Sequence, residues 1–343
     1  DGRFAQVLLF CFRVGGVLPW ESIGCARWAA TYRCMIIIWA VLAFVCMLAE
    51  VSEGVMMTSS SAGVSLSNVS MAAGMVAILT LLGLPCGQQH LDEVVSLLQA
   101  YARRHDLQHL WISRVKRDTI VLVSTFIGAL VLNLSGMLDS GSGTEETYVF
   151  VLRRVATFTV FTVLLLVILF FLYILRVLAV LVDVFSCQLV NFLQISEAAH
   201  KWNLLQAILR KAAISIQVGL LAFLAMAACT IPAFILALMR YGQRLQVLRL
   251  LLPHILIVLG ILRMFLMAAT VTGKCTRMAS LINSLDFGSG TVQDRRRLVE
   301  YIQNSAAGFY VFDMRLTTGM VAKFIYLWAV VTFGLLSRTL FQD

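Results

Sequence analysis

The stretch Val155–Val182 reads VATFTVFTVLLLVILFFLYILRVLAVLV and contains one charged residue, Arg176. It is longer than the roughly 20 apolar residues that a helix needs to cross a bilayer. The chain contains six further apolar stretches, at Met35–Val51, Ser65–Pro85, Ile120–Leu138, Ala212–Met239, Leu250–Thr270 and Leu316–Leu336. The seven stretches predict an all-α membrane protein in which seven transmembrane helices form a single domain over residues 1–343.

Positive charge alternates between the segments that connect these stretches. The N-terminal segment and every second connection after it hold about 18 of the 27 Lys and Arg residues, whereas the alternate set holds about six. Basic residues collect on the cytoplasmic side of a membrane. Because seven spans place the two ends on opposite sides, the N-terminus is predicted to be cytoplasmic and the C-terminus extracellular. A G-protein-coupled receptor has the opposite orientation, which excludes that class.

Composition agrees with this class of protein. The chain is 60% hydrophobic and 13% charged, with a net charge of +9, which is typical of a polytopic helical membrane protein. Basic residues in connections that face the cytoplasm are attracted to anionic lipid headgroups. We therefore expect membrane lipid rather than nucleic acid as a partner, and a multi-pass location in the plasma membrane.

The sequence lacks the spacings that mark common catalytic and metal sites, including HExxH, CxxC and paired carboxylates. We accordingly predict no enzymatic activity, no cofactor and no metal. A membrane transporter stays an alternative, although the seven stretches show no internal repeat of the kind that transporters carry. Asn68-Val-Ser70 and Asn133-Leu-Ser135 are glycosylation sequons on or near the predicted outer side.

Two connections have helical patterns of their own. Helical periodicity continues beyond the fourth stretch through Phe192 to Trp202, and a second helix is predicted from Arg296 to Asn304 with Leu298 and Ile302 on one face. These segments are interpreted either as helices on the membrane surface or as a packed cytoplasmic base that other subunits share. Their apolar faces predict that the base, rather than the outer bundle, holds subunits together.

Three basic residues lie inside the apolar stretches, namely Arg176, Arg263 and Lys323. A cation is costly in the bilayer unless it snorkels, pairs or faces water. All three lie in the predicted inner halves of their stretches, so we expect their side chains to snorkel to the cytoplasmic edge.

The C-terminal part of the chain carries a family resemblance. Residues Ala307–Arg315 read AGFYVFDMR, and they precede the segment IYLWAVVTF at Ile325–Phe333. This arrangement resembles the C-terminal signature of insect gustatory receptors, in which a Gly-Phe-Phe-type stretch and a basic residue lead into Thr-Tyr, five hydrophobic residues and Gln-Phe. Tyr326 and Phe333 match that signature with the same spacing, whereas Ile325 and Thr332 replace its Thr and Gln. The chain is identified as a divergent arthropod gustatory receptor or gustatory-receptor-like protein, and an olfactory-type receptor channel of the same architecture stays an alternative.

The resemblance implies a homo- or heterotetrameric, ligand-gated, non-selective cation channel with four copies of the seventh helix around one pore. The implied pore and gate residues are Tyr326, Ala329, Thr332, Phe333 and Leu336. In this family a small-molecule tastant binds each subunit in the outer half of helices two to six. Placed by depth, the candidate ligand-binding residues are Asn133, Tyr148, Phe158, Phe161, Thr230, Phe234 and His254, with core packing as the alternative role of each. Their aromatic and apolar character predicts a bitter-like or lipophilic ligand rather than a sugar.

Overall fold

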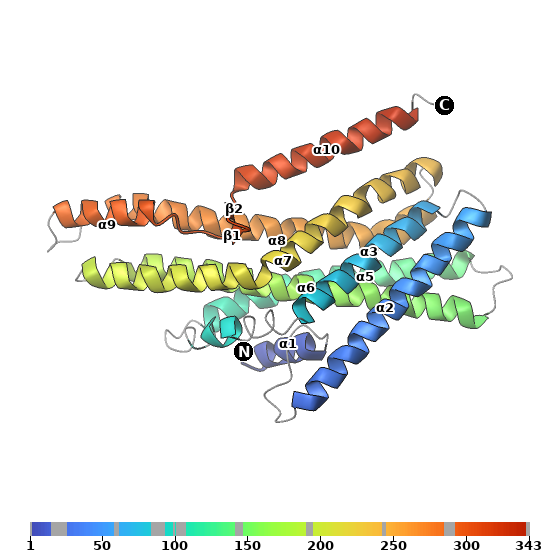
Figure 1. Cartoon of the computed structure of the whole chain (residues 1–343), viewed down its shortest axis with the longest axis horizontal. Coiled ribbons are helices and arrows are strands. Elements are labelled where there is room, and N and C mark those ends of the chain that lie inside the picture. The colour runs from blue at the N-terminus through green and yellow to red at the C-terminus, as the bar shows by residue number, and fades with distance from the viewer. Residues whose placement is uncertain are drawn as a thin grey trace.

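The computed structural model describes residues 2–14, 26–57, 62–83, 93–98, 100, 108–140, 147–189, 195–241, 245–284 and 292–340. Within these residues the chain is nearly all helical (Figure 1). The helices are α1 (Gly2–Val14), α2 (Ala26–Met57), α3 (Ala62–Gly83), α5 (Gln108–Ser140), α6 (Thr147–Leu189), α7 (Ile195–Tyr241), α8 (Leu245–Ser284), α9 (Val292–Asn304) and α10 (Thr318–Leu340). A short helical segment covers residues 93–98. The expectation of an all-α fold is corrected in one place, because two short strands, β1 (Tyr310–Val311) and β2 (Met314–Arg315), separate α9 from α10.

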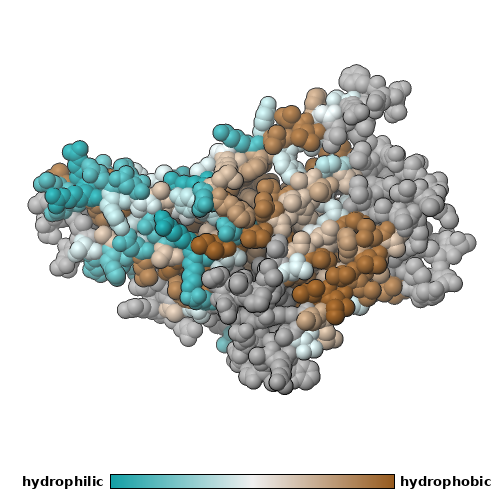
Figure 2. Space-filling model, in the orientation of Figure 1, coloured by the Kyte–Doolittle hydropathy of each residue, from teal (hydrophilic) through white to brown (hydrophobic). Residues whose placement is uncertain are grey.

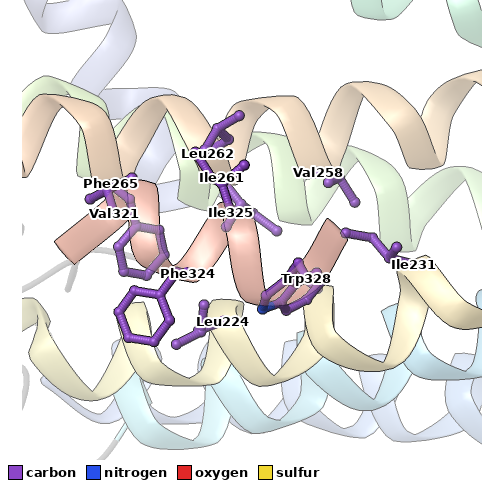
Figure 3. Close-up of a pocket in the computed structure, with 11 residues that line it drawn as sticks. Leu224, Ile231, Val258, Ile261, Leu262, Phe265, Val321, Phe324, Ile325 and Trp328 are labelled. Carbon is purple, nitrogen blue, oxygen red and sulfur yellow. The ribbon is translucent and has the colours of Figure 1, made fainter. Parts of the chain in front are cut away.

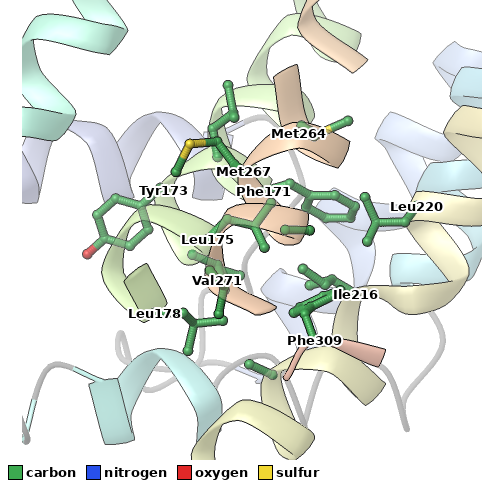
Figure 4. Close-up of a cluster of buried hydrophobic side chains, with 14 of the residues drawn as sticks. Phe171, Tyr173, Leu175, Leu178, Ile216, Leu220, Met264, Met267, Val271 and Phe309 are labelled. Atoms are coloured by element: carbon green, nitrogen blue, oxygen red, sulfur yellow. The ribbon is translucent and has the colours of Figure 1, made fainter. Parts of the chain in front are cut away.

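Helix α6 forms the centre of the bundle. From Val163 to Leu172 its side chains are apolar on every face, and Leu164, Phe170 and Leu178 are all 0% exposed. A helix that is hydrophobic all round lies either in a protein core or in a membrane, and here other helices surround it. Figure 4 shows side chains of α7 and α8, together with Phe309, gathered around this part of α6. The stretch with the highest hydropathy is therefore the core of the molecule.

Each of the seven predicted stretches coincides with a long helix, apart from the ends of two. Leu84 and Pro85 lie outside the described residues, and α10 begins at Thr318, two residues after Leu316. Within the described residues, α6, α7 and α8 contain helices long and apolar enough to cross a membrane, at Arg154–Leu189, Ser196–Ala233 and Leu251–Ser284. Shorter apolar helices lie at Cys34–Ala49, Ser67–Thr80 and Thr318–Gly334.

Surface hydropathy divides the molecule along its long axis. Figure 2 shows hydrophilic side chains gathered around α9 and hydrophobic ones over the opposite part of the bundle. Exposed apolar residues include Ile38 on α2, Ile127 on α5 and Leu259 on α8. An apolar surface of this extent is typical of helices that contact lipid. We call the end of the bundle away from α9 its outer end, and the region around α9 its base.

The base contains the two helical extensions that the sequence predicts. Helix α6 continues past Val182 to Leu189, and α7 begins at Ile195, while Phe192 lies outside the described residues. Helix α9 confirms the predicted helix between Arg296 and Asn304.

The apolar faces in the base are covered within the single chain, whereas the sequence predicts that they contact other subunits. Trp202, Leu205, Leu298 and Ile302 are between 0 and 4% exposed within the single chain. Trp202 Nε1 donates to Ser305 Oγ at 2.9 Å, which joins α7 to the end of α9. The faces that sequence reasoning assigned to a partner subunit are covered by the chain's own helices, since α9 folds back on α8 and α7.

The β1–β2 hairpin connects the base to α10. Tyr310 pairs with Arg315 and Val311 with Met314 in an antiparallel register, and both turn residues, Phe312 and Asp313, have positive φ. The hairpin is anchored by Phe309, which is 0% exposed and whose backbone N–H donates to Thr272 Oγ1 of α8 at 3.0 Å. The starting point of α10 is therefore fixed to α8.

Candidate functional site

A polar cluster lies between α3, α7 and α8 near the outer end of the bundle. His254 Nε2 is 3.0 Å from Ser67 Oγ and 3.0 Å from Asn68 Oδ1. Because a carbonyl oxygen can only accept, the imidazole Nε2–H is the donor to Asn68. His254, Ser67 and Asn68 are 2%, 0% and 7% exposed. Buried polar side chains of this kind between membrane helices are often functional.

The cluster continues towards α7 and α6. Ser70 Oγ lies 2.7 Å from Thr230 Oγ1, and Thr230 in turn donates to the carbonyl of Met226. On the α6 side, the ring of Phe161 meets the His254 imidazole edge-on, with centroids 4.8 Å apart. The cluster therefore combines hydrogen-bonding groups with an aromatic ring, which are the residue types that orient small, mostly apolar ligands in proteins.

Two prolines lie beside this cluster. Pro232 follows Thr230 by two residues within α7, and Pro253 directly precedes His254 within α8. Proline inside a helix removes a backbone hydrogen bond and favours a kink. Both helices thus have a weakened point at the depth of the polar cluster.

The structure brings together three of the seven predicted ligand-binding residues, namely Phe161, Thr230 and His254. Phe158 is not part of the cluster, because its side chain is 56% exposed on the outside of α6; depth alone did not distinguish the two faces of that helix. The side chains of Asn133, Tyr148 and Phe234 lie outside the described residues. Sequence reasoning missed Ser67, Asn68 and Ser70 as site residues, although polar side chains within the second apolar stretch were a signal for them.

The same contacts bear on the first glycosylation sequon. Asn68 lies inside α3, is 7% exposed and accepts a hydrogen bond from His254. A glycan needs an exposed asparagine. In this fold Asn68 serves the polar cluster instead.

Helix α10 stands at the side of the bundle, next to α7 and α8 (Figure 1). Of the predicted pore and gate residues, Tyr326 is 72% exposed, Phe333 is 73% exposed and Ala329 is also exposed. Thr332 is half-buried, and the side chain of Leu336 lies outside the described residues. The chain's own helices therefore leave the Tyr326–Phe333 face of α10 open.

The opposite face of α10 borders an apolar cavity of about 170 Å³. Val321, Phe324 and Trp328 line it from α10, and Leu224 and Phe265 are among the side chains that face them from α7 and α8. Figure 3 shows these side chains directed into the space between the three helices. Contact between α10 and the helices α7 and α8 is thus incomplete at this point.

The two arginines in the predicted spans do not snorkel separately, which corrects the sequence-based expectation. Both bind Asp118 of α5: Arg176 Nη2 is 2.6 Å from Oδ2 and Arg263 Nη2 is 2.9 Å from Oδ1. The Asp118 side chain is 16% exposed, against 25% for Arg176 and 37% for Arg263. This Asp118 triad joins α5, α6 and α8 and reduces the cost of placing cations at this depth.

Comparisons with known proteins identify the fold. No protein-family model matches the sequence, and no curated protein does. Among solved structures, the insect olfactory receptor OR5 from Machilis hrabei superposes with a TM-score of 0.74, covering 97% of both chains at 10% identity. The same receptor in complex with eugenol gives a TM-score of 0.74 over 98% of both chains at 9% identity. The chain therefore has the fold of an insect olfactory receptor from end to end.

Proposed function

We propose that this chain is a subunit of a chemoreceptor channel of the insect type, in which a small molecule bound at the outer end of the bundle opens a cation pore. The end-to-end likeness in fold to an insect olfactory receptor is the observation that carries the proposal. The seven long helices and the apolar outer surface support a multi-pass location in the plasma membrane.

The proposed pore follows from the open face of α10. An exposed Tyr326 and Phe333 on an apolar helix need either lipid or other protein to cover them. In a homo- or heterotetramer, four copies of α10 around one axis would cover these faces and line the pore. Aromatic rings at such a constriction exclude ions because wetting an apolar ring is unfavourable.

The proposed ligand site is the polar cluster of His254, Ser67 and Asn68 with the aromatic ring of Phe161. Its few hydrogen-bonding groups favour a compact, largely apolar molecule with one or two polar groups over a sugar. Gustatory specificity is supported by the spacing of Tyr326 and Phe333 in the C-terminal signature, with a lipophilic, bitter-like tastant as ligand. Olfactory-type function is the second candidate, favoured by the solved structures that share the fold.

Ligand-evoked current tests the site. We expect the chain, expressed in a cell line, to respond to some members of a panel of small aromatic compounds that includes eugenol. Phe161→Ala and His254→Leu should raise the half-maximal concentration of an active compound by about tenfold or more, equivalent to about 1.4 kcal/mol of lost binding. Phe158→Ala is the matched control on the same helix, and its response should equal that of the parent.

Surface labelling of each variant would confirm equal expression. A Phe158 variant as impaired as the Phe161 variant would remove the ligand from this cluster. Parent-like responses from both the Phe161 and the His254 variants would likewise show that the ligand binds elsewhere.

A further inference from the structure

A second cavity lies in the base, distant from the proposed ligand site and from the pore face of α10. It has a volume of about 370 Å³ and opens between α8, α9 and the end of the hairpin. Thr276, Ser280 and Asn283 line it from α8, Gln303 from α9 and Arg315 from β2. Hydroxyl, amide and guanidinium groups therefore converge on one space, in contrast to the wholly apolar cavity beside α10.

Arg315 is the charged residue of this lining, which contains no Asp or Glu. Its Nη2 donates to the carbonyl of Ala307 at 2.6 Å and to Thr276 Oγ1 at 3.1 Å. A guanidinium has five N–H donors. The Nε–H, although buried, has no hydrogen-bond partner among the described residues, and no described carboxylate forms an ion pair with Arg315.

The charge of the cavity comes from Arg315 rather than from the arginines of α9. Arg296 pairs with Glu300 and Arg297 with Asp294, and neither arginine lines the cavity. Asn283 and Gln303 supply neutral amide donors at the rim of the same space. The cavity therefore combines the fixed cation of Arg315, which has no described counter-charge, with neutral amide donors. This combination is electrostatically suited to an anion.

We propose that this cavity binds a phosphate group, with Arg315 as the charged anchor and the α8 and α9 amides as further donors. Guanidinium and phosphate match in geometry and charge, because two parallel N–H groups can meet two oxygens. The phosphate belongs either to a soluble cytosolic compound or to the headgroup of an inner-leaflet lipid. Residues 275–283 follow the predicted end of the sixth span at Thr270 by five or more residues, roughly 8 to 20 Å along the helix, which is within reach of both.

Such a site has a direct connection to the proposed pore. Arg315 is the last residue of β2, and α10 begins three residues later at Thr318. A bound phosphate would tie α8 and α9 to the segment from which α10 starts. The channel's sensitivity to its outer ligand would then depend on occupancy of the base.

The test measures binding rather than current, so its result is independent of the proposed channel function. The full chain is purified in detergent, and inorganic phosphate is titrated by calorimetry at constant ionic strength. We expect saturable binding to the parent protein, loss of binding in Arg315→Met, and binding weaker by about tenfold or more in Arg315→Lys, because lysine keeps the charge but not the fork.

Two further variants separate a phosphate site from a purely structural arginine. Ser280→Phe fills the cavity from its exposed rim and leaves Arg315 and its two hydrogen bonds in place, so it should fold like the parent and still lose phosphate. Arg277→Met removes an exposed charge from the same helix outside the cavity and should bind like the parent. Thermal unfolding of each variant shows whether it has folded.

A second arm distinguishes the two sources of phosphate. The same variants are reconstituted in nanodiscs of phosphatidylcholine with or without a minor fraction of a phosphatidylinositol phosphate. Binding of inorganic phosphate in the first arm supports a soluble compound as the ligand. If only the phosphatidylinositol phosphate raises the unfolding temperature, and the variants lose this effect as predicted for phosphate binding, the ligand is a lipid headgroup. Absence of both effects would overturn the proposal, as would unchanged binding in Ser280→Phe or equal losses in Arg277→Met and Arg315→Met.

Discussion

Asp118 shows how one residue changes the interpretation of two others. Taken alone, Arg176 and Arg263 are cations in apolar stretches, and snorkelling is a sufficient account of each. The fold places the carboxylate of Asp118 between them, with one oxygen for each guanidinium. Their role is therefore to join α5, α6 and α8 rather than to contact the membrane edge.

Neutralising Asp118 should destabilise the protein more than removing one of its partners. Asp118→Asn leaves two guanidinium groups without a counter-charge, and we expect a loss of about 2 kcal/mol, below the value for fully buried pairs because both arginines are partly exposed. Arg263→Met leaves a balanced pair with Arg176 and should cost less. Thermal unfolding of the detergent-purified variants measures both.

Glu300→Gln is the control for this comparison, because it breaks the exposed Arg296–Glu300 pair within α9. That change should alter stability by no more than about 0.5 kcal/mol. If Asp118→Asn were no more harmful than Arg263→Met, the triad would not be a stabilising unit.

Helices α6 and α7 approach each other closely at Gly219, which has no side chain to keep them apart. A Cβ added at Gly219 of α7 would lie 2.5 Å from Cζ of Phe171, a fully buried ring of α6. At Gly128 of α5, by contrast, an added Cβ meets no atom within 4 Å. The two positions test whether close approach of helices, rather than glycine as such, is required.

We expect alanine at these two positions to have opposite effects on stability. Gly219→Ala should lower the free energy of unfolding by about 1–3 kcal/mol, since the rigid Phe171 ring must move. Gly128→Ala should be neutral or stabilising by up to about 1 kcal/mol, because alanine is the better helix former. Equal effects in thermal unfolding would contradict the described packing of α6 against α7.

Helix α10 has a different environment on each of its faces, with an apolar cavity on one side and an open aromatic face on the other. If Phe333 forms part of an apolar constriction, Phe333→Ser should raise basal cation current in the absence of ligand, as should Thr332→Asp, because polar groups lower the barrier to wetting. Patch-clamp recording measures this effect. Val331→Ser, directed away from the proposed lumen, should leave basal current low.

The two pore variants are compared at matched surface expression. Parent-like basal current and selectivity in both would place the conduction path elsewhere than on α10. A rise in Val331→Ser equal to that in Phe333→Ser would indicate a loosened helix rather than a wetted gate.

For the whole molecule, the orientation in the membrane is the most direct expectation. The base contains α9 with its arginine run, and the predicted cytoplasmic segments carry about three times as many Lys and Arg residues as the alternate set. The C-terminal end of α10 points away from that base (Figure 1). The base should therefore lie in the cytoplasm and the C-terminus outside.

Epitope tags test this orientation on intact cells. Antibody should label a tag placed after Asp343 without permeabilisation, and a tag placed before Asp1 only after permeabilisation. The reverse pattern would contradict both the orientation and the proposed location of the phosphate site.

The sequence by itself determined the helices, because a run of apolar side chains near 20 residues long has few stable alternatives in a bilayer. It also determined the α9 helix and the burial of one face, through the spacing of Leu298 and Ile302. These features depend on residues that are close along the chain, and periodicity reports them directly.

Only the tertiary structure decided which residues meet across helices. His254 and Asn68 are 186 positions apart, and Arg263 and Asp118 are 145 apart; the sequence contained each of them but not their pairing. Depth along a helix follows from position in the sequence, whereas the direction of a side chain around the axis follows from packing. For that reason Phe161 lies beside His254 whereas Phe158, at nearly the same depth, is exposed, and the apolar faces of the base are covered by the chain itself.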